Sequence, residues 1–220
     1  MSVIRPTAVV WDFNGTLLDD VALAAASISE VLRRRDLPVL DVAMHRRVFG
    51  FPISAYYERL GLDLSVEALT DLADEFHEAY LAGVEGCSLN DGVLGLLEHF
   101  QRSDVPQFIL SAAQQSLLCS WVRVHGVEPF FQLVYGLPDR LAKTKIDRGI
   151  DLFRDQHIVP SETLFIGDTD HDVEVAEALG GHPAVVLQGH QDRARFTEAT
   201  CDVFDDFHGL MSALSGTEQP

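Results

Sequence analysis

The chain has 220 residues, of which 47% are hydrophobic and 23% are charged, as in a soluble globular protein of one domain or of one domain with a small insert. Its 16 basic and 34 acidic residues give a net charge of −18, which argues against nucleic acid or an anionic membrane surface as a partner. No apolar run reaches the roughly 18 residues of a membrane span, and the first residues lack a signal-peptide pattern, so we expect a cytoplasmic protein. The three widely spaced cysteines match no metal-binding spacing and are expected to be reduced thiols of the core: Cys87, Cys119 and Cys201.

The first predicted element is a strand buried on both faces, "TAVVW" (residues 7–11), which ends abruptly at Asp12. From about residue 20 to 85, hydrophobic residues recur at helical spacing, and proline and glycine divide this region into about four helices. Ser65 is the predicted N-cap of the last of them, because an acidic residue follows in the first turn.

From residue 90 onward, predicted strands and amphipathic helices alternate. The further strands are expected at residues 106–110, 132–135, 163–167, 183–187 and 201–204. Repeated strand–helix units indicate a parallel sheet with helices on both faces, so the predicted fold class is α/β, with a doubly wound, Rossmann-like core. Because the helical block follows the first strand, it is expected to be an inserted all-helical cap. The predicted division is therefore a core of residues 1–18 and 87–220 and a cap of residues 19–86, with "VEGCSLNDG" as the return hinge.

Three of the predicted strands end on a polar side chain: Asp12, Ser111 and Asp168. In an open parallel sheet, ligands bind at the carboxyl ends of the strands, so these side chains are expected at one edge. Asp172 follows in the same segment as Asp168, within "GDTDHD". The two lysines of the chain, Lys143 and Lys145, lie together in "DRLAKTKIDRG".

This set of residues suits phosphoryl chemistry. Clustered carboxylates favour Mg²⁺, and a lysine helps to neutralise a phosphate. An aspartate such as Asp12 can attack phosphorus to form an acyl phosphate. Backbone N–H groups in the turn formed by Asn14, Gly15 and Thr16 are expected to meet the phosphate oxygens.

At this point the sequence resembles the haloacid dehalogenase-like hydrolases. The residues that carry the resemblance are "DFNGTLLD", Ser111 after an apolar strand, a lysine in the third segment and "GDTDHDVEVA", and their order and spacing match over nearly the whole chain. The helical insert stands in the place of the family's first type of cap. Phosphoglycolate-phosphatase-like members are the most similar in layout.

The resemblance implies a role for each matching position. Asp12 is implied as the nucleophile and as a Mg²⁺ ligand, with the backbone carbonyl of Asn14 also on the metal. Ser111 and its neighbour Ala112 are implied at the phosphoryl group. Lys145 is implied to steady the nucleophile and the phosphate, with Lys143 as the less favoured candidate.

Two further acids complete the metal site that the resemblance implies. Asp168 is implied as a Mg²⁺ ligand, and Asp172 is implied to orient either the water shell of the metal or the lysine. The same segment also holds Asp170, which suits an N-cap and a metal ligand equally well, and His171, which suits a solvated helix position better than a proton carrier.

Asn14 departs from the family pattern. Phosphatases of this family normally carry an aspartate two residues after the nucleophile, where it exchanges a proton with the leaving group and with water, and an amide cannot do so. Three explanations stay open: an engineered replacement, another acid such as His171 or a cap residue, or a chain that has drifted away from phosphatase activity.

The sequence therefore predicts a Mg²⁺-dependent hydrolase of a small phosphate monoester, which acts through a phosphorylated Asp12. Arg46 and Arg47, in the predicted cap, are candidates to reach a second anionic group of the substrate, and Arg47 is the preferred one. The alternatives are a binding or regulatory protein that keeps the phosphate site with little turnover, and a 2-haloacid dehalogenase. The expected partner is a small phosphorylated metabolite, and the expected state is a monomer or a small homo-oligomer.

Overall fold

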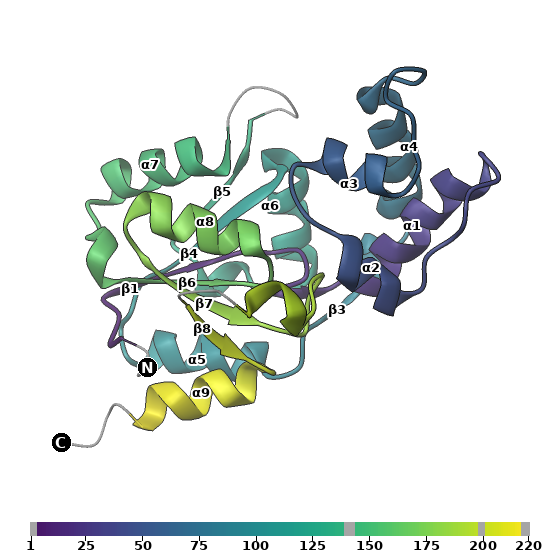
Figure 1. Cartoon of the computed structure of the whole chain (residues 1–220). Helices are drawn as coiled ribbons and strands as arrows, with labels where there is room; N and C mark the ends of the chain where they lie inside the picture. The colour runs from purple at the N-terminus through teal and green to yellow at the C-terminus, as the bar shows by residue number, and fades with distance from the viewer. Residues whose placement is uncertain (1–3, 139–143, 198–200, 217–220) are drawn as a thin grey trace.

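The computed structural model describes residues 4–138, 144–197 and 201–216. In this part of the chain, six strands form one sheet in the order β5-β4-β1-β6-β7-β8, and every neighbouring pair is parallel. Their bounds are β1 Ala8–Trp11, β4 Gln107–Gln114, β5 Leu133–Leu137, β6 Thr163–Gly167, β7 His182–Val186 and β8 Asp202–Phe204. Helices cover both faces of this sheet (Figure 1), so the predicted α/β doubly wound fold class is confirmed.

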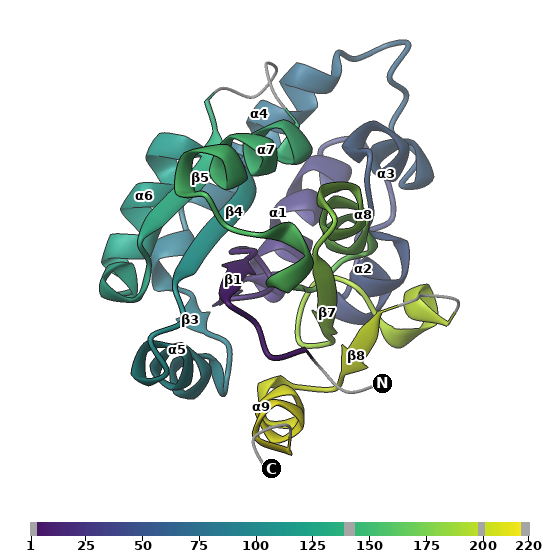
Figure 2. The ribbon, with the colours of Figure 1, turned by 90° about the vertical axis from the view of Figure 1, so that its left-hand side faces the viewer.

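The alternation of side chains along β1 explains why helices cover both faces. Val9 and Trp11 point to one side, where α5, α6 and α9 contribute to a large apolar cluster, whereas Ala8 and Val10 point to α7 and α8 on the other side. The helix bounds are α5 Val93–Arg102, α6 Gln115–Val124, α7 Lys145–Gln156, α8 Asp170–Leu179 and α9 Phe207–Gly216. Figures 1 and 2 both show α5 and α9 side by side beneath the sheet. None of the helices in the described residues is long and apolar enough to cross a membrane.

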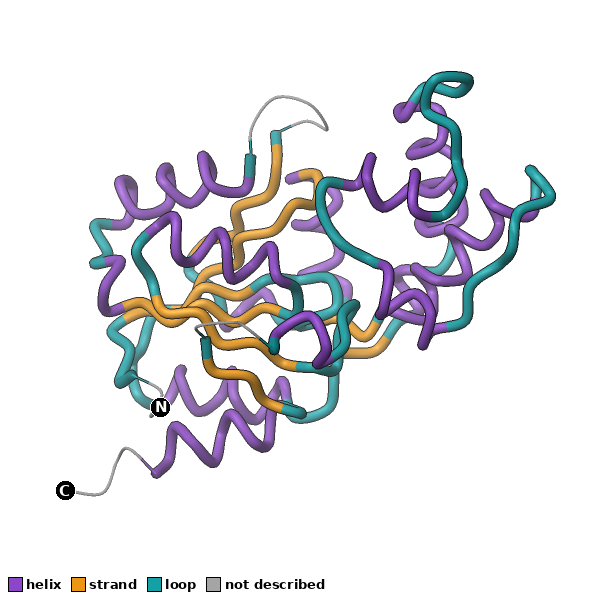
Figure 3. Tube along the Cα trace, in the orientation of Figure 1, coloured by secondary structure: helices purple, strands orange, loops and turns teal. Residues whose placement is uncertain are grey.

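The four α-helices between β2 and β3 form a separate unit beyond the carboxyl ends of the sheet strands (Figure 3). They are α1 Val21–Arg33, α2 Val42–Val48, α3 Ile53–Arg59 and α4 Leu69–Leu81. Their inner faces build an apolar cluster of their own, which includes Ile28, Tyr56 and Leu72. Helices at this position agree with the prediction of about four, and we refer to this unit as the cap.

The start of α4 differs from the prediction. Ala68 is its N-cap, and Ser65 lies three residues earlier, where its backbone N–H and its hydroxyl both donate to Asp63 Oδ1. A serine that bonds to a nearby aspartate stabilises a turn rather than a helix, so the predicted N-cap was wrong.

The three cysteines are free thiols, as expected, but they are only partly buried rather than part of the core.

A small antiparallel ladder joins the cap to the core, and the sequence did not reveal it. It consists of β2 Leu18–Asp19 and β3 Ser88–Leu89, so both chain passages cross the junction side by side. The predicted domain boundaries fall at this ladder, although the division into two domains stays a prediction. Short 3-10 helices complete the described elements: η1 Val84–Gly86, η2 Glu128–Phe130, η3 Pro160–Glu162 and η4 Arg193–Phe196.

Candidate active site

The turn that follows β1 presents Asp12 at the carboxyl edge of the sheet. Leu18 N donates to Phe13 O at 2.9 Å, and Gly15 N donates to Leu18 O at 3.0 Å, so the turn folds back on itself. Gly15 has φ +76°, and a Cβ there would lie 2.4 Å from Asp168 Oδ2. Only glycine satisfies both constraints, and the tight turn therefore brings Asp12 and Asp168 together.

Three carboxylates meet at this edge. Asp12, Asp168 and Asp172 each offer an oxygen, and these oxygens all lie within 4.8 Å of one another. Lys145 Nζ lies 2.6 Å from Asp12 Oδ1 and also donates to Asp172 Oδ1. The structure thus pairs Lys145 with the predicted nucleophile, whereas Lys143 lies outside the described residues.

Helix starts hold these groups in place. Lys145 opens α7 directly after the N-cap Thr144. Asp172 belongs to the capping box of α8, because its Oδ2 accepts the N–H and the hydroxyl of Thr169, at 3.0 and 2.7 Å. One oxygen of Asp172 accepts the hydrogen bonds of the capping box, and the other accepts the hydrogen bond of Lys145. The start of α8 therefore fixes the carboxylate that orients the lysine.

Asp170 does not belong to this cluster. Its carboxylate lies 2.6 Å from Arg195 Nη2 and accepts a hydrogen bond from Gln191 Nε2 at 2.8 Å. The N-cap of α8 is Thr169, so the N-cap reading of Asp170 was wrong, and the carboxylate is paired away from the other acids.

The three acids carry more negative charge than Lys145 neutralises. Burial raises the pKa of Asp12 to about 7 against the attraction of Lys145, and burial raises the pKa of Asp168 to about 6. For Asp172, burial raises the pKa, but the attraction of Lys145 and the hydrogen bonds from Lys145 and Thr169 together outweigh burial and lower it. A buried oxygen cluster with surplus negative charge is a donor set that fits a hard divalent cation such as Mg²⁺.

Asp168 is held firmly enough to act as a ligand. It is fully buried, its Oδ1 accepts the hydroxyl of Thr16 at 2.8 Å, and its Oδ2 accepts the N–H of His190 at 2.7 Å. Thr16 is itself fully buried, and its hydroxyl holds the Asp168 carboxylate in position.

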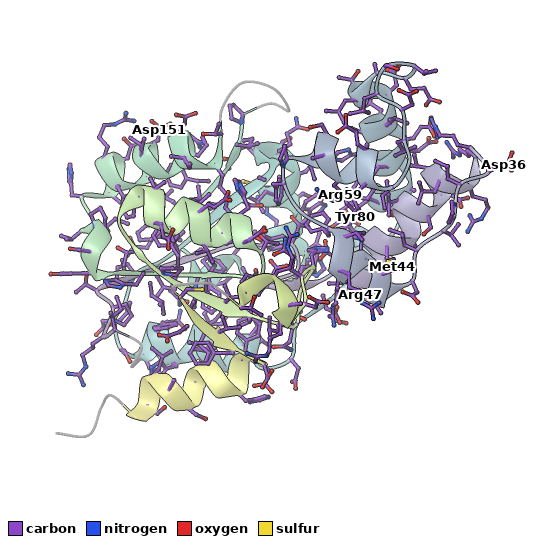
Figure 4. The ribbon with its side chains drawn as sticks, viewed as in Figure 1. Asp36, Met44, Arg47, Arg59, Tyr80 and Asp151 are labelled. Atoms are coloured by element: carbon purple, nitrogen blue, oxygen red, sulfur yellow. The ribbon has the colours of Figure 1, made fainter. Side chains whose placement is uncertain are left out.

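Asn14 is fixed by residues that sequence reasoning missed. Its Nδ2 donates to Asp20 Oδ2 at 3.0 Å and to the hydroxyl of Tyr80, on α4 of the cap, at 2.7 Å. Figure 4 labels Tyr80 on the side of the cap toward the core, and its ring belongs to the apolar cluster that packs against the sheet. Asp20 also accepts the hydroxyl of Tyr80 and the N–H of Gly15, the latter at 2.7 Å, so the Gly15 N–H is engaged within the turn.

Asp20 pairs with a buried histidine of the core. His190 Nε2 lies 3.2 Å from Asp20 Oδ1, and His190 Nδ1 lies 3.1 Å from His45 Nε2 on α2. Burial favours the neutral imidazole of His190, but the hydrogen bond to Asp20 and the combined attraction of Asp20, Asp168 and Asp12 outweigh it and raise the pKa of His190 to about 9. Burial lowers the pKa of His45 to about 3, so the second ring stays neutral. Nothing in the spacing of these residues along the chain marks them as partners.

A cavity of about 150 Å³ opens over the carboxylates. Its lining consists of Asp12, Asn14, Phe49, Phe51, Ser111, Ala112, Ala113, Lys145, Asp168, Thr169, His171, Asp172 and His190. A larger hollow of about 540 Å³ lies at the opposite, amino-terminal end of β1, beside Thr7 and Leu214, and is remote from this chemistry.

The structure brings most of the predicted site residues to this cavity. Ser111 is buried within β4, which runs further than predicted, to Gln114, and Ala112 lies beside it. Gly15 and Thr16 lie behind the carboxylates rather than in the lining. Their roles in substrate binding stay predictions.

Arg47 does not reach the cavity. On α2, His45 points inward and is 1% exposed, and Arg47 lies two positions further, about 200° around the helix, where it is exposed (Figure 4). Its neighbour Arg46 contacts the core instead, because its Nη2 donates to Gln188 O at 2.7 Å. The structure therefore does not support the prediction that Arg47 contacts substrate.

The cap closes the cavity with aromatic residues from the loop between α2 and α3. The ring of Phe49 lies 5.0 Å from the ring of His190, and the ring of Phe51 lies 4.5 Å from that of His171. Gln191 Nε2 also donates to Phe49 O at 3.2 Å. Sequence reasoning missed both phenylalanines, because phenylalanine is the expected residue of any core.

Residues 9–186 match the family model described as haloacid dehalogenase-like hydrolase. The chain therefore belongs to the haloacid dehalogenase-like hydrolase family, which confirms the predicted family. A phosphoglycolate phosphatase of Pseudomonas putida is 26% identical over 215 residues, which cover 94% of this chain and 79% of that protein.

Other similar proteins carry different names. The tyrosine-protein kinase PtkA of Mycobacterium tuberculosis is 26% identical over 201 residues; the match covers 89% of this chain and spans 66% of the length of that relative. A haloacid dehalogenase-like family protein of Streptococcus pneumoniae superimposes with a TM-score of 0.81 at 20% identity, covering 94% of this chain and 98% of that one, which shows the shared fold.

Proposed function

We propose that the protein is a Mg²⁺-dependent phosphohydrolase that cleaves a small phosphate monoester through a phosphorylated Asp12. The observation that carries this proposal is the meeting of Asp12 with Lys145 and two further carboxylates beside the buried Ser111, at the carboxyl edge of the sheet. The similarity to a phosphoglycolate phosphatase supports the reaction class.

Asp12, Asp168 and the backbone carbonyl of Asn14 would hold the Mg²⁺, with Asp172 behind them as the partner of Lys145. The bound ion would supply positive charge that neutralises the phosphate and draws electrons from phosphorus. The remaining steps fall to side chains of the chain itself.

In the first step, a carboxylate oxygen of Asp12 forms a bond to phosphorus, and the bond between phosphorus and the ester oxygen breaks. The electron pair of that bond leaves with the ester oxygen. Lys145 stabilises the charge on Asp12 and on the phosphoryl oxygens, and the hydroxyl of Ser111 donates a hydrogen bond to one of them.

In the second step, water attacks phosphorus and breaks the bond to Asp12. Inorganic phosphate leaves, Asp12 becomes a carboxylate again, and the spare proton of the water passes through solvent to the released alkoxide or phenolate. Asn14 cannot accept that proton, and its Nδ2 is already engaged with Asp20 and Tyr80. General base catalysis is typically worth about 10²–10⁴ in rate, so the second step is expected to limit turnover.

The test is rapid mixing of the protein with 4-nitrophenyl phosphate and Mg²⁺. We expect a burst of nitrophenol near one equivalent, followed by slow turnover, and a mass increase of one phosphoryl group on acid-quenched protein. Asp12→Asn is expected to lose the burst, the turnover and the mass increase. Turnover that survives in Asp12→Asn at the parent rate contradicts the proposal.

A second candidate is a binding or regulatory protein that retains the phosphate site with little turnover. Asn14 favours it, because the amide lacks a transferable proton. This candidate would be supported over the first if the protein binds inorganic phosphate in a separate binding measurement but shows no burst of nitrophenol in the rapid-mixing experiment. A 2-haloacid dehalogenase is the weaker alternative, because those enzymes usually carry an aromatic residue at the position of Asn14.

A further inference from the structure

The cavity over the carboxylates has two unlike sides. Asp12, Ser111 and Lys145 belong to the core and form its polar floor. Phe49 and Phe51 come from the cap, and their rings lie against those of His190 and His171. A substrate bound between these sides meets charge at one end and aromatic rings at the other.

The aromatic side faces the place where the leaving group must lie. Phosphoryl transfer holds the attacking and leaving oxygens roughly in line through phosphorus. Because Asp12 attacks from the edge of the sheet, the ester oxygen points away from the sheet and toward the cap. The group that leaves is therefore expected to contact Phe49 and Phe51.

The described lining offers little to a second anionic group. Within residues 4–138, 144–197 and 201–216, Lys145 is the one lysine or arginine that lines the cavity, and its ammonium already pairs with Asp12 and Asp172. Protonated His190 also lines the cavity, but its two ring nitrogens are engaged with Asp20 and His45. Arg47 is exposed outside the cavity, and Arg46 donates to a backbone carbonyl. The net charge of −18 adds a general repulsion for any further negative charge on the substrate.

Asn14 restricts the leaving group independently of the cavity wall. Without an acid at this position, the ester oxygen departs as an anion. A phenol has a pKa of about 10, as in tyrosine, whereas water and simple alcohols lie near about 15–16. A phenolate is therefore a much better leaving group than an alkoxide, and a planar ring also matches the aromatic side of the cavity.

Resting on the phosphohydrolase function proposed above, we propose that the substrates are aryl phosphate monoesters whose aromatic group carries no second anion. The oxygen of Asp12 bonds to phosphorus, the bond between phosphorus and the phenolic oxygen breaks, and phenolate leaves with the electron pair. Water then releases phosphate from Asp12, and its spare proton reaches the phenolate through solvent, so phenol and hydrogen phosphate are the products.

The test compares kcat/KM for phenyl phosphate, 2-phosphoglycolate and acetyl phosphate with Mg²⁺. Acetyl phosphate has a good leaving group without a ring, and it reports the phosphorylation of Asp12 alone. We expect phenyl phosphate to exceed phosphoglycolate by about 10² or more, because the missing acid is typically worth about 10²–10⁴.

Phe51→Leu keeps an apolar side chain but removes the ring. The ratio of kcat/KM for phenyl phosphate to that for acetyl phosphate is expected to fall about 3- to 10-fold, the range of a lost aromatic contact. Phe49→Leu is the second variant if Phe51→Leu does not fold. Phe131→Leu makes the same change just before β5, at the end of that strand remote from the site, and is expected to leave the ratio unchanged.

The outcomes separate this inference from the proposed function. If phosphoglycolate is cleaved at least as fast as phenyl phosphate, or if the folded phenylalanine variants keep the parent ratio, the aryl assignment falls while phosphohydrolase activity stands. If none of the three compounds phosphorylates Asp12 or is turned over, the proposed function itself falls.

Discussion

Replacement of Asn14 by aspartate is expected to destabilise the fold by an amount that depends on pH. Asn14 Nδ2 lies 3.0 Å from Asp20 Oδ2, and Asp20 is 1% exposed, so the variant sets two carboxylates side by side in a buried site. At an effective dielectric constant of about 20, two unit charges about 3 Å apart repel by roughly 5 kcal/mol. Protonation of one carboxyl at pH 7 costs about 4 kcal/mol, because its ordinary pKa is about 3.9 and each pH unit is worth about 1.36 kcal/mol.

Protonation of one carboxyl costs less free energy than the repulsion between two charged carboxylates, so the folded variant takes up a proton. This uptake fixes the sign of the pH dependence. The shared proton raises the folded-state pKa of the pair above the unfolded value. Above about pH 4, the folded variant therefore retains a proton that the unfolded chain releases, and its free energy of unfolding falls as the pH rises. Relative to the parent, we expect losses of about 1.5 kcal/mol at pH 5 and about 4 kcal/mol at pH 7.

The assay is urea unfolding of the parent and the variant at both pH values, in the presence of EDTA. Gln101→Glu, on the exposed face of α5, adds the same charge at the surface and is expected to change stability by less than about 0.5 kcal/mol. The double variant Asn14→Asp/Asp20→Asn again pairs one amide with one carboxylate, so it is expected to regain at least half of the stability lost at pH 7. An Asn14→Asp variant that is as stable as the parent at pH 7, or that loses the same amount at both pH values, refutes this reasoning.

Three further predictions rest on other parts of the site. The pKa of His190 is raised from 6.5 to about 9, so its contribution to stability is complete below about pH 6.5 and is lost as the pH rises through about 9. Urea unfolding in EDTA should show that the free energy of unfolding declines by about 3 kcal/mol over this range. This decline is expected to be absent in His190→Gln. Arg47→Ala is expected to change kcat/KM less than about 2-fold, whereas Arg46→Ala, which removes the bond to Gln188 O, is expected to lower the melting temperature by a few degrees; a large loss of kcat/KM in Arg47→Ala would restore the sequence-based assignment. Mg²⁺ at about 100 times its Kd is expected to stabilise the protein by about 2.7 kcal/mol in thermal unfolding, and a shift of the same size in Asp168→Asn would show that the ion binds elsewhere.

Much of the site could be predicted from the sequence because its residues lie at the ends of recognisable strands. Asp12, Ser111 and Asp168 follow short apolar runs, and a parallel sheet brings the ends of such runs to one edge whatever the details of packing. Lys145 was also predictable, since the chain has only two lysines and both lie in one connection. These inferences needed only local patterns and the rules of sheet topology.

The partners of Asn14 were not predictable in this way. Tyr80 is 66 residues from Asn14 and His190 is 170 residues from Asp20, and each of these residues would suit many other sites equally well. The exposed position of Arg47 was not predictable for a related reason: a sequence shows that an arginine belongs to a helix, but the packing of that helix decides which side of it faces the cavity.

The sequence by itself thus determined the α/β core, the helical insert after the first strand and the set of acids at the sheet edge, because each depends on residues close together in the chain. The tertiary structure alone decided how the cap sits on the core. That arrangement places Phe49 and Phe51 over the carboxylates, turns Arg47 away and surrounds Asn14 with Asp20 and Tyr80. It depends on the fit of surfaces from distant segments, and such a fit leaves no periodic signal in the order of the residues.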